Sequence, residues 1–203
     1  MHKKRCFGDG DPLYERYHDT EWGRPVIDEH GLYERLCLEA FQAGLSWRTV
    51  LHKRTAFRSA FAGFDPERVA RYTRRDVTRL MGDEGIIRNR AKIEAAIANA
   101  RAVLDLRDSE TPLVALVWSF APARSPVPRS YADMPATTSV SEALAKTLRA
   151  HGFRFVGPTT AYATMQAAGL VNDHMAGCPV RAAVERERAA AIKKLALPNK
   201  NSK

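Results

Sequence analysis

Residues 28–44 read "DEHGLYERLCLEAFQAG", and this stretch sets the fold class. Its apolar residues recur with the 3.6-residue period of an α-helix. At about 100° per residue, the side chains that project within one sector of roughly 60° are Leu32, Leu36, Glu39 and Ala43. Gly44 ends the pattern, so the sequence predicts a helix over residues 28–43.

Helical patterns fill most of the remaining chain as well. The segments that carry them are residues 65–72, 76–81, 90–106, 111–120, 139–152 and 157–169. Asp65 and Thr111 each stand before a proline in the first helical position, which is a common way to begin a helix. Neither a β-hairpin nor an internal repeat is indicated, and the predicted fold class is therefore all-α.

The segment over 139–152 also carries signals for both of its ends. Ser139 and Glu142 have the spacing of a capping box, and Gly152 is placed to end the helix as a C′ residue. Before it, residues 121–138 are rich in proline and predict a long ordered loop. Residues 181–203 form a charged extension that is either helical or disordered.

The composition excludes several classes of protein. The 203 residues are 45% apolar and 27% charged, which is typical of a globular chain with a hydrophobic core. No apolar run approaches the roughly 20 residues of a membrane span. The basic start "MHKKRC" leads into no apolar signal core, so we expect a cytoplasmic protein. Its three cysteines, an odd and sparse set, argue against a disulfide framework and favour free or metal-bound thiols.

The net charge of +9 suggests an acidic partner, but most of the charge lies at the two ends of the chain. Residues 181–203 carry seven Lys or Arg against two Glu, and Lys3, Lys4 and Arg5 add three positive charges. The body between them is left with +1. A surface for nucleic acid must then be a local patch on a nearly neutral body.

Glu39 is the anomaly of the helix over 28–43, because it lies on the apolar side while Glu34 points away from that side. A glutamate in this position needs a partner. Two interpretations stay open: a salt bridge to an arginine, or a buried carboxylate that binds or catalyses. Leu45 and Trp47 follow on a predicted turn, which would place the indole ring beside the carboxylate.

A second group of rings stands near the N-terminus, in "DPLYERYHDTEWGRP" over residues 11–25. Tyr14, Tyr17 and Trp22 show no clean helical or strand period there, so a loop or short helix is predicted. With Glu39 and Trp47 they suggest a pocket for a flat aromatic ligand. The ring faces would stack on the ligand and the carboxylate would accept hydrogen bonds from its N–H groups.

Two cysteines and two histidines near the ends of the chain form a possible metal set. The set is Cys6, His18, His174 and Cys178, and two Cys with two His suit tetrahedral zinc. The spacing is that of no compact zinc finger, and an ordinary buried thiol beside unrelated histidines is the alternative. A metal here would join the two ends of the chain and fix the aromatic segment. Cys37 lies inside the helix over 28–43 with no histidine on its face and is assigned to the core.

A basic hairpin is the last candidate. The stretch "GDEGIIRNRAKIEAAIANAR" over 82–101 joins two predicted helices through a turn that contains glycine. Arg88, Arg90 and Lys92 gather where the second helix begins, and its backbone N–H groups could hold a DNA phosphate there. Helix–hairpin–helix units bind DNA in this way, but their usual G-x-G consensus is missing. A solvated basic face therefore stays open as the alternative.

Six motifs occur in one order along the chain: "DPLYERYHDTEWGRP", "CLEAFQAGLSWRTVL", "GIIRNRAKIEAAIANARA", "VWSF", "GFRFVGPTTAY" and "MQAAGLVNDHMAGC". From Cys6 to Cys178 the chain thereby resembles bacterial 3-methyladenine DNA glycosylase I, the zinc-containing branch of the helix–hairpin–helix DNA glycosylases. The resemblance implies a helical domain over 1–180, with a pocket between two lobes. It also implies a DNA repair enzyme that hydrolyses the N-glycosidic bond of 3-methyladenine. Free base would be released and an abasic site left, with no lyase step.

The resemblance further implies a role for each candidate residue. One structural zinc ion would be held by Cys6, His18, His174 and Cys178. The extruded base would meet an ionised Glu39, with Trp47 stacked on it and Tyr14, Tyr17 and Trp22 around it. The turn that intercalates into DNA would be Gly44 and Leu45. The hairpin residues on the DNA backbone would be Arg88, Arg90 and Lys92.

One pocket wall departs from the family. The family has a tryptophan two residues after the first zinc cysteine, whereas "CFGDGDP" is one residue shorter and offers Phe7 as the replacement. The extension over 181–203 has no counterpart, and we interpret it as solvated or disordered, with nonspecific affinity for DNA. The expected partner is double-stranded DNA with alkylated bases, bound by a monomer and without a membrane.

Two other classes of protein stay open from the residues themselves. A zinc-stabilised DNA-binding protein without activity would need the basic surfaces but has no use for Glu39 on an apolar face. A small-molecule enzyme could use the same aromatic pocket.

Overall fold

The computed structural model describes residues 5–8 and 10–195, and within them the chain is helical with no strand. The α-helices are α1 (Pro12–Thr20), α2 (Glu29–Gln42), α3 (Trp47–Ala60), α4 (Pro66–Ala70), α5 (Arg74–Met81), α6 (Arg90–Arg107), α7 (Leu113–Trp118), α8 (Ser139–Ala150), α9 (Pro158–Ala167) and α10 (Arg181–Lys194). Two short 3₁₀ helices are η1 (Ala62–Phe64) and η2 (Tyr131–Asp133). The predicted all-α class is confirmed for this part of the chain. The predicted charges at Lys3 and Lys4 and the end of the extension, residues 196–203, lie outside the described residues.

Several helices begin and end where the sequence predicts. Asp65 accepts hydrogen bonds from the backbone N–H groups of Glu67 and Arg68, and Pro66 is the first helical residue of α4. After α8, Gly152 has a φ of +86°, the left-handed conformation of a C′ residue.

The starts of α7 and α8 differ from the prediction. Thr138 is extended and caps α8 by accepting a hydrogen bond from the backbone N–H of Ser141. The capping box predicted at Ser139 and Glu142 is therefore wrong by one residue. Pro112 is also extended, with a ψ of 156°, so it precedes α7 instead of opening it.

The turn predicted around Trp47 is shorter than expected. Ser46 accepts a hydrogen bond from the backbone N–H of Thr49, and this cap starts α3 at Trp47. The aromatic stretch near the N-terminus is mostly helix α1, which Asp11 caps. Helix α1 thereby carries Tyr14 and Tyr17, and helix α3 carries Trp47.

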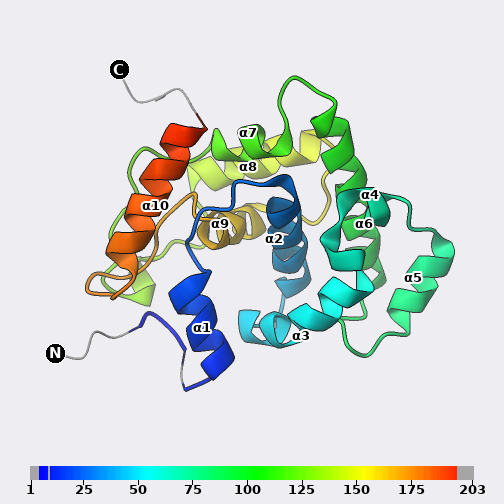
Figure 1. The fold of residues 1–203 in the computed structure, drawn as a ribbon, viewed down its shortest axis with the longest axis horizontal. Helices are drawn as coiled ribbons and strands as arrows, with labels where there is room; N and C mark the ends of the chain where they lie inside the picture. Colours follow the sequence, from blue (N-terminus) through cyan, green and yellow to red (C-terminus); the bar gives the residue numbers. More distant parts are fainter. Residues whose placement is uncertain (1–4, 9, 196–203) are drawn as a thin grey trace.

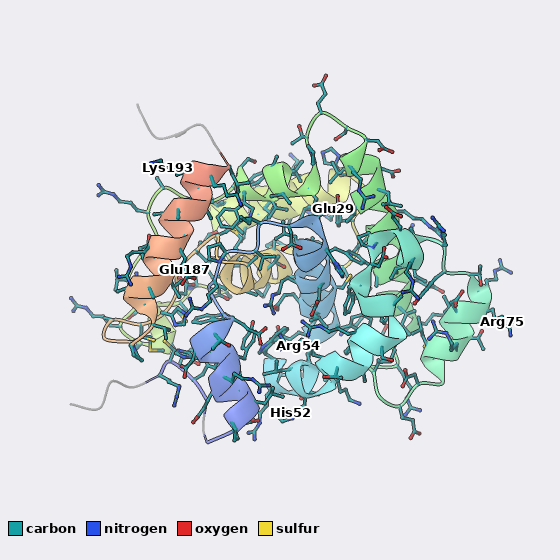
Figure 2. All side chains as sticks on the ribbon, in the orientation of Figure 1. Glu29, His52, Arg54, Arg75, Glu187 and Lys193 are labelled. Carbon is teal, nitrogen blue, oxygen red and sulfur yellow. The ribbon has the colours of Figure 1, made fainter. Side chains whose placement is uncertain are left out.

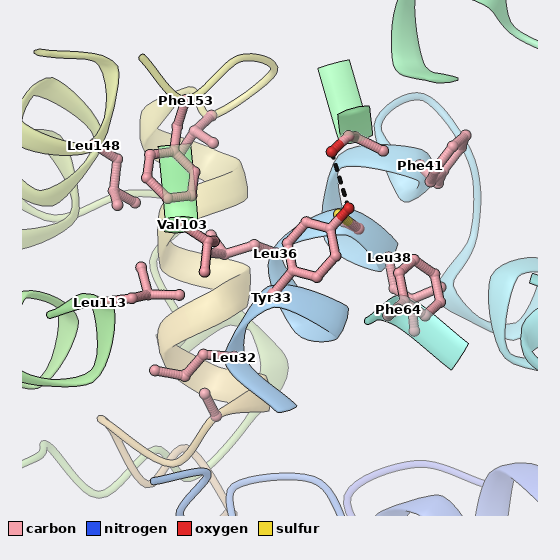
Figure 3. Close-up of a cluster of buried hydrophobic side chains, with 14 of the residues drawn as sticks. Leu32, Tyr33, Leu36, Leu38, Phe41, Phe64, Val103, Leu113, Leu148 and Phe153 are labelled. Atoms are coloured by element: carbon pink, nitrogen blue, oxygen red, sulfur yellow. Dashed lines mark hydrogen bonds between the residues drawn. The ribbon is translucent and has the colours of Figure 1, made fainter. Parts of the chain in front are cut away.

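Helix α2 runs through the middle of the molecule (Figure 1) and packs against α3, α6, α7 and α9. Its apolar side chains are fully buried, among them Leu32 and Leu36. Figure 3 shows this cluster, in which the Tyr33 hydroxyl donates to the carbonyl oxygen of Ala96 at 2.9 Å. Because these four helices pack against α2, the position of Glu39 is fixed relative to the rest of the molecule.

Helix α10 lies along one side of the molecule, at the left in Figure 1, and is packed onto the body. Val184 and Arg188 are buried in this contact. The Arg188 guanidinium donates to the carbonyl oxygen of Leu170 at 2.8 Å and also to that of Pro122. The first part of the predicted extension is thus an ordered helix. Within the described residues, no helix has both the length and the apolar character needed to cross a bilayer.

Candidate functional site

The four residues of the predicted metal set meet at one point. Their ligand atoms, two cysteine sulfurs and two imidazole nitrogens, all lie within 4.8 Å of one another, and all four residues are buried. The Cys178 sulfur is 3.5 Å from His18 Nε2 and 3.5 Å from His174 Nδ1. The Cys6 sulfur is 3.7 Å from His174 Nδ1. The group could therefore hold a metal ion between two distant parts of the chain.

Oxygen atoms behind the two imidazole rings orient them. His18 Nδ1 is 2.8 Å from Oδ1 of Asp19, so its Nε2 faces the sulfurs. His174 Nε2 is 3.0 Å from the carbonyl oxygen of Trp22, so its Nδ1 faces them. Such partners fix the tautomer of a metal-binding histidine. Arg181, the first residue of α10, donates to the carbonyl oxygen of His174 and supports the same segment.

The chemistry of the donors fits a four-coordinate metal. The pKa of the Cys178 thiol is lowered, first by its hydrogen bond with Cys6 and then, against the opposing effect of burial, by those with His174 and His18. The same contact raises the pKa of the Cys6 thiol. Both thiols must lose their protons to bind a metal ion, which the positive charge of the ion favours.

A cavity of about 220 Å³ lies next to this cluster. It is lined by Phe7, Tyr14, Tyr17, Trp22, Glu39, Gln42, Trp47, Tyr131, Met134, Ala163 and Gln166. All five residues predicted for the pocket are in this set. Pockets for drug-sized ligands run roughly 300–1,000 Å³, so this cavity suits a smaller ligand, of the size of a single base.

The rings of the cavity pack on one another and on the metal cluster. Phe7 stacks on Tyr14 with ring centroids 4.5 Å apart and meets the edge of Trp22 at 5.0 Å. Phe7 is also 4.9 Å from the ring of His18, edge to face. Phe7 therefore forms part of the cavity wall, and its replacement of the family's tryptophan stays a prediction. On the other side, Tyr17 tilts against Trp47 at 5.2 Å.

Glu39 is 5% exposed, and within the described part of the chain no hydrogen bond or ion pair reaches its carboxyl group. Arg35, one turn earlier on α2, is paired with Glu21 instead. Burial raises the pKa of Glu39 to about 8, and the charge of Arg35 offsets only part of that effect. The salt-bridge interpretation is therefore wrong. Glu39 is a buried carboxyl group in a cavity, and its burial favours the protonated form. An ionised Glu39 against a bound cationic base stays a prediction.

Two buried arginines stand behind Tyr17 of α1, namely Arg35 of α2 and Arg54 of α3. Figure 2 labels Arg54 where these helices come close together. The guanidinium carbons of Arg35 and Arg54 lie 5.6 and 5.9 Å from the centroid of the Tyr17 ring. Both donate to Glu21, Arg54 at 2.8 Å and Arg35 at 3.2 Å. Burial opposes ionisation of Glu21, but these hydrogen bonds and charges outweigh it and lower its pKa. The Tyr17 wall is thus backed by two cations that one carboxylate holds in place.

The sequence analysis missed part of the cavity wall. Gln42 is three residues after Glu39, a spacing that places both on one side of α2 and could have been noticed. Tyr131 and Met134 come from the predicted loop over 121–138. Gln166 lies on α9, far from Glu39 in the sequence, and no local pattern marks it.

The turn between α2 and α3 carries the two residues predicted to enter DNA. Gly44 has a φ of +81°, which glycine adopts at no steric cost, and Leu45 is 44% exposed. Lys92 fastens this turn from α6. Its Nζ donates to the carbonyl oxygens of Phe41 at 2.9 Å and Ala43 at 2.6 Å, at the end of α2.

The sequence prediction placed Lys92 on a surface that contacts DNA. The structure shows instead that Lys92 is buried. It is 7% exposed, and burial lowers its pKa. The end of a helix leaves carbonyl groups without partners, and the ammonium group satisfies two of them. Arg88 and Arg90 differ, because their side chains are 51% and 59% exposed and each makes a surface ion pair with a glutamate one turn away on the chain. Their contact with phosphate stays a prediction.

Known proteins are similar to this chain in sequence and in fold. The family model of methyladenine glycosylases matches residues 7–182. DNA-3-methyladenine glycosylase 1 of Escherichia coli (strain K12) is 51% identical over 170 residues, which are 83% of this chain and 91% of that protein. A crystal structure of 3-methyladenine DNA glycosylase I has a TM-score of 0.84 at 48% identity and covers 87% of this chain and 98% of its own. A tyrosine-to-phenylalanine variant of such an enzyme, solved in complex with 3-methyladenine, has a TM-score of 0.84 at 34% identity, with coverages of 89% and 98%.

A family model that spans most of the chain, together with relatives of this identity, defines the class: the chain belongs to the methyladenine glycosylase family. The resemblance carried by the six motifs is thereby confirmed.

Proposed function

We propose that this protein acts as a DNA-3-methyladenine glycosylase. It hydrolyses the bond between the methylated base and deoxyribose in alkylated DNA, releases 3-methyladenine and leaves an abasic site. The observation that carries the proposal is Glu39, a buried carboxyl group without a partner among the described residues, in a cavity walled by aromatic rings. A relative with this function in its name and a related structure with 3-methyladenine bound support it.

The substrate supplies much of its own activation. Methylation at N3 places a formal positive charge on the adenine ring, so the base is a good leaving group before any proton is added. Electron-rich ring faces attract such a cation by roughly 0.5–2 kcal/mol per contact. Trp47 stacks on the base, and Tyr14, Tyr17 and Trp22 complete the walls of the cavity. The cavity thus selects cationic purines over neutral adenine.

Glu39 recognises one edge of the base. That edge of adenine offers N7 as an acceptor and the N6 amino group as a donor. A protonated Glu39 can donate to N7 and accept from N6 at once. The positive charge of the entering base favours the ionised form of Glu39, which then stabilises that charge.

The nucleotide must leave the helix before it can reach this cavity, at a cost of a few kcal/mol. In our proposal Leu45 fills the gap in the DNA, and Arg88 and Arg90 hold phosphates beside the helix–hairpin–helix unit that α5 and α6 form. Lys92 positions the turn of Gly44 and Leu45 through its bonds to the end of α2. Because its ammonium group is engaged there, the enzyme has no lyase step through Lys92.

Zinc is the metal we propose for the cluster of Cys6, His18, His174 and Cys178, since two thiolates and two imidazoles suit it. Four protein ligands leave no open position for water, so the ion stabilises the fold and takes no part in the reaction. It would hold His18 and thereby the adjacent Tyr17. Residues 1–180 then form one domain with the cavity between two lobes, and the enzyme works as a cytoplasmic monomer on duplex DNA.

The proposal is tested by base release. Methylated duplex DNA is incubated with the protein, and released bases are separated by chromatography. We expect 3-methyladenine from the wild type and a rate roughly 10- to 100-fold lower for Glu39→Gln. The amide can keep the hydrogen bonds but cannot ionise, and a hydrogen bond to a charged group contributes ~1.5–3 kcal/mol. Glu34→Gln is the matched control, since Glu34 is on the same helix and pairs with Arg58. A wild type that binds this DNA but releases no base would overturn the proposal.

A further inference from the structure

Gln166 is a second polar residue of the cavity, and it lies on a different helix from Glu39. Helix α9 packs directly against α2, and the two residues line the same cavity. A glutamine amide has a donor end and an acceptor end. Which end faces a ligand therefore decides which chemical group the residue recognises.

The orientation of this amide is fixed by Asp173. The buried Oδ2 atom of Asp173 is 2.8 Å from Gln166 Nε2 and 2.7 Å from the hydroxyl oxygen of Tyr162. A carboxylate only accepts hydrogen bonds, so the end of the amide that faces it must be the NH₂ group. The Tyr162 hydroxyl donates to the same oxygen and holds the carboxylate in place. Oε1 of Gln166 is therefore the end turned away from Asp173.

No described residue donates a hydrogen bond to this Oε1 atom. We propose that Gln166 Oε1 reads position 6 of the extruded base: it accepts an N–H of a 6-amino group and disfavours a 6-oxo group. This inference rests on the proposed function and deepens it. It names Gln166 as the residue that sets the preference for 3-methyladenine over 3-methylguanine.

Glu39 discriminates between these two bases only in part. A protonated carboxyl group can donate to one of the two acceptors, N7 and O6, on the same edge of a 6-oxopurine. The Gln166 amide cannot donate in this way, because turning it would set Oε1 against the Asp173 carboxylate. A fixed acceptor facing a carbonyl oxygen leaves both groups unpaired, and such mismatches reject a ligand strongly.

The experiment compares the two bases within one reaction. A duplex that contains both 3-methyladenine and 3-methylguanine is treated with excess wild type, Gln166→Met or Gln42→Met, and the two release rates are measured. Methionine keeps the size of glutamine and removes the acceptor. Because the same protein molecules release both bases, any inactive fraction cancels in the ratio of the rates.

We expect Gln166→Met to lower the preference for 3-methyladenine by roughly 5- to 30-fold, as for one lost hydrogen bond. Gln42 also lines the cavity, and no hydrogen bond from the described residues fixes its amide, so Gln42→Met should keep the ratio within about 2-fold of the wild type. An unchanged ratio for Gln166→Met, or an equal fall for Gln42→Met, would overturn the inference. A wild type that releases neither base would instead overturn the proposed function.

Discussion

Two buried polar sites, the metal cluster and the aromatic cavity, lie side by side in this protein. They differ in whether their polar groups have hydrogen-bond partners. In the metal cluster, both histidine rings have an oxygen partner behind them and ligand atoms in front. In the cavity, the indole N–H of Trp47 is buried without a partner, and no described residue makes a hydrogen bond to the carboxyl group of the buried Glu39. Leaving such a group unpaired costs about 1–3 kcal/mol. The cluster is thus arranged to stabilise the fold, whereas the cavity is arranged to receive a ligand that supplies the missing partners.

The largest effect should come from breaking the cluster. We expect Cys6→Ser to reduce bound zinc below about half an equivalent and to destabilise the fold by several kcal/mol, because binding of a structural metal is coupled to folding. Elemental analysis and thermal unfolding measure the two effects. Cys37→Ala is the control, since Cys37 is equally buried but lies in the core of α2, away from the cluster. If Cys6→Ser keeps both the metal and the stability of the wild type, the cluster is not a metal site.

The second effect concerns the cavity and depends on pH. Folding raises the pKa of Glu39 from 4.5 to about 8, so the folded state keeps a proton that the unfolded state releases. The wild type should therefore lose stability relative to Glu39→Gln as the pH rises from about 4.5 to 8, by a few kcal/mol in total. Urea unfolding at pH 4.5, 6 and 8.5 (pH values chosen to span about that range) measures the difference.

The matched control for this pH dependence is Glu34→Gln, because Glu34 is on the same helix and already has Arg58 as its partner. Its difference from the wild type should stay within about 1 kcal/mol at all three pH values. A Glu39→Gln protein whose advantage does not grow with pH would mean that Glu39 has a partner after all, and the contrast between the two sites would fail.

The sequence predicted the parts of both sites that local patterns mark. The helical period exposes Glu39 on the wrong side of α2, and the two Cys and two His stand out by residue type. It could not predict the partners that arrive from a distance. Lys92 shows this best, because a sequence records its charge but not the carbonyl groups of Phe41 and Ala43 that bury it. Gln166 was missed for the same reason, since only the packing of α9 on α2 brings it to the cavity.

The third effect compares the buried cation of Lys92 with the exposed cation of Arg90. We expect Lys92→Met to lower stability by about 1–3 kcal/mol, because two carbonyl groups lose their partner. It should leave the salt dependence of DNA binding unchanged. Arg90→Gln should do the reverse, with near-normal stability and a salt slope smaller by about 1. Binding titrations at several salt concentrations measure this slope. A smaller salt slope for Lys92→Met than for the wild type would mean that Lys92 contacts DNA.

The smallest effect tests the residue that touches both sites. Phe7 follows Cys6, packs edge to face on His18 and stacks on Tyr14 in the cavity. If the ring serves the cavity, Phe7→Leu should weaken binding of 3-methyladenine by roughly 2- to 10-fold, since an aromatic contact contributes about 0.5–1.5 kcal/mol. The fluorescence of Trp22 and Trp47 can follow that binding, and Phe7→Trp should restore it. Bound zinc should stay at about one equivalent, because all four ligands are intact. Loss of zinc with unchanged affinity for the base would mean that Phe7 stabilises the metal cluster and not the cavity.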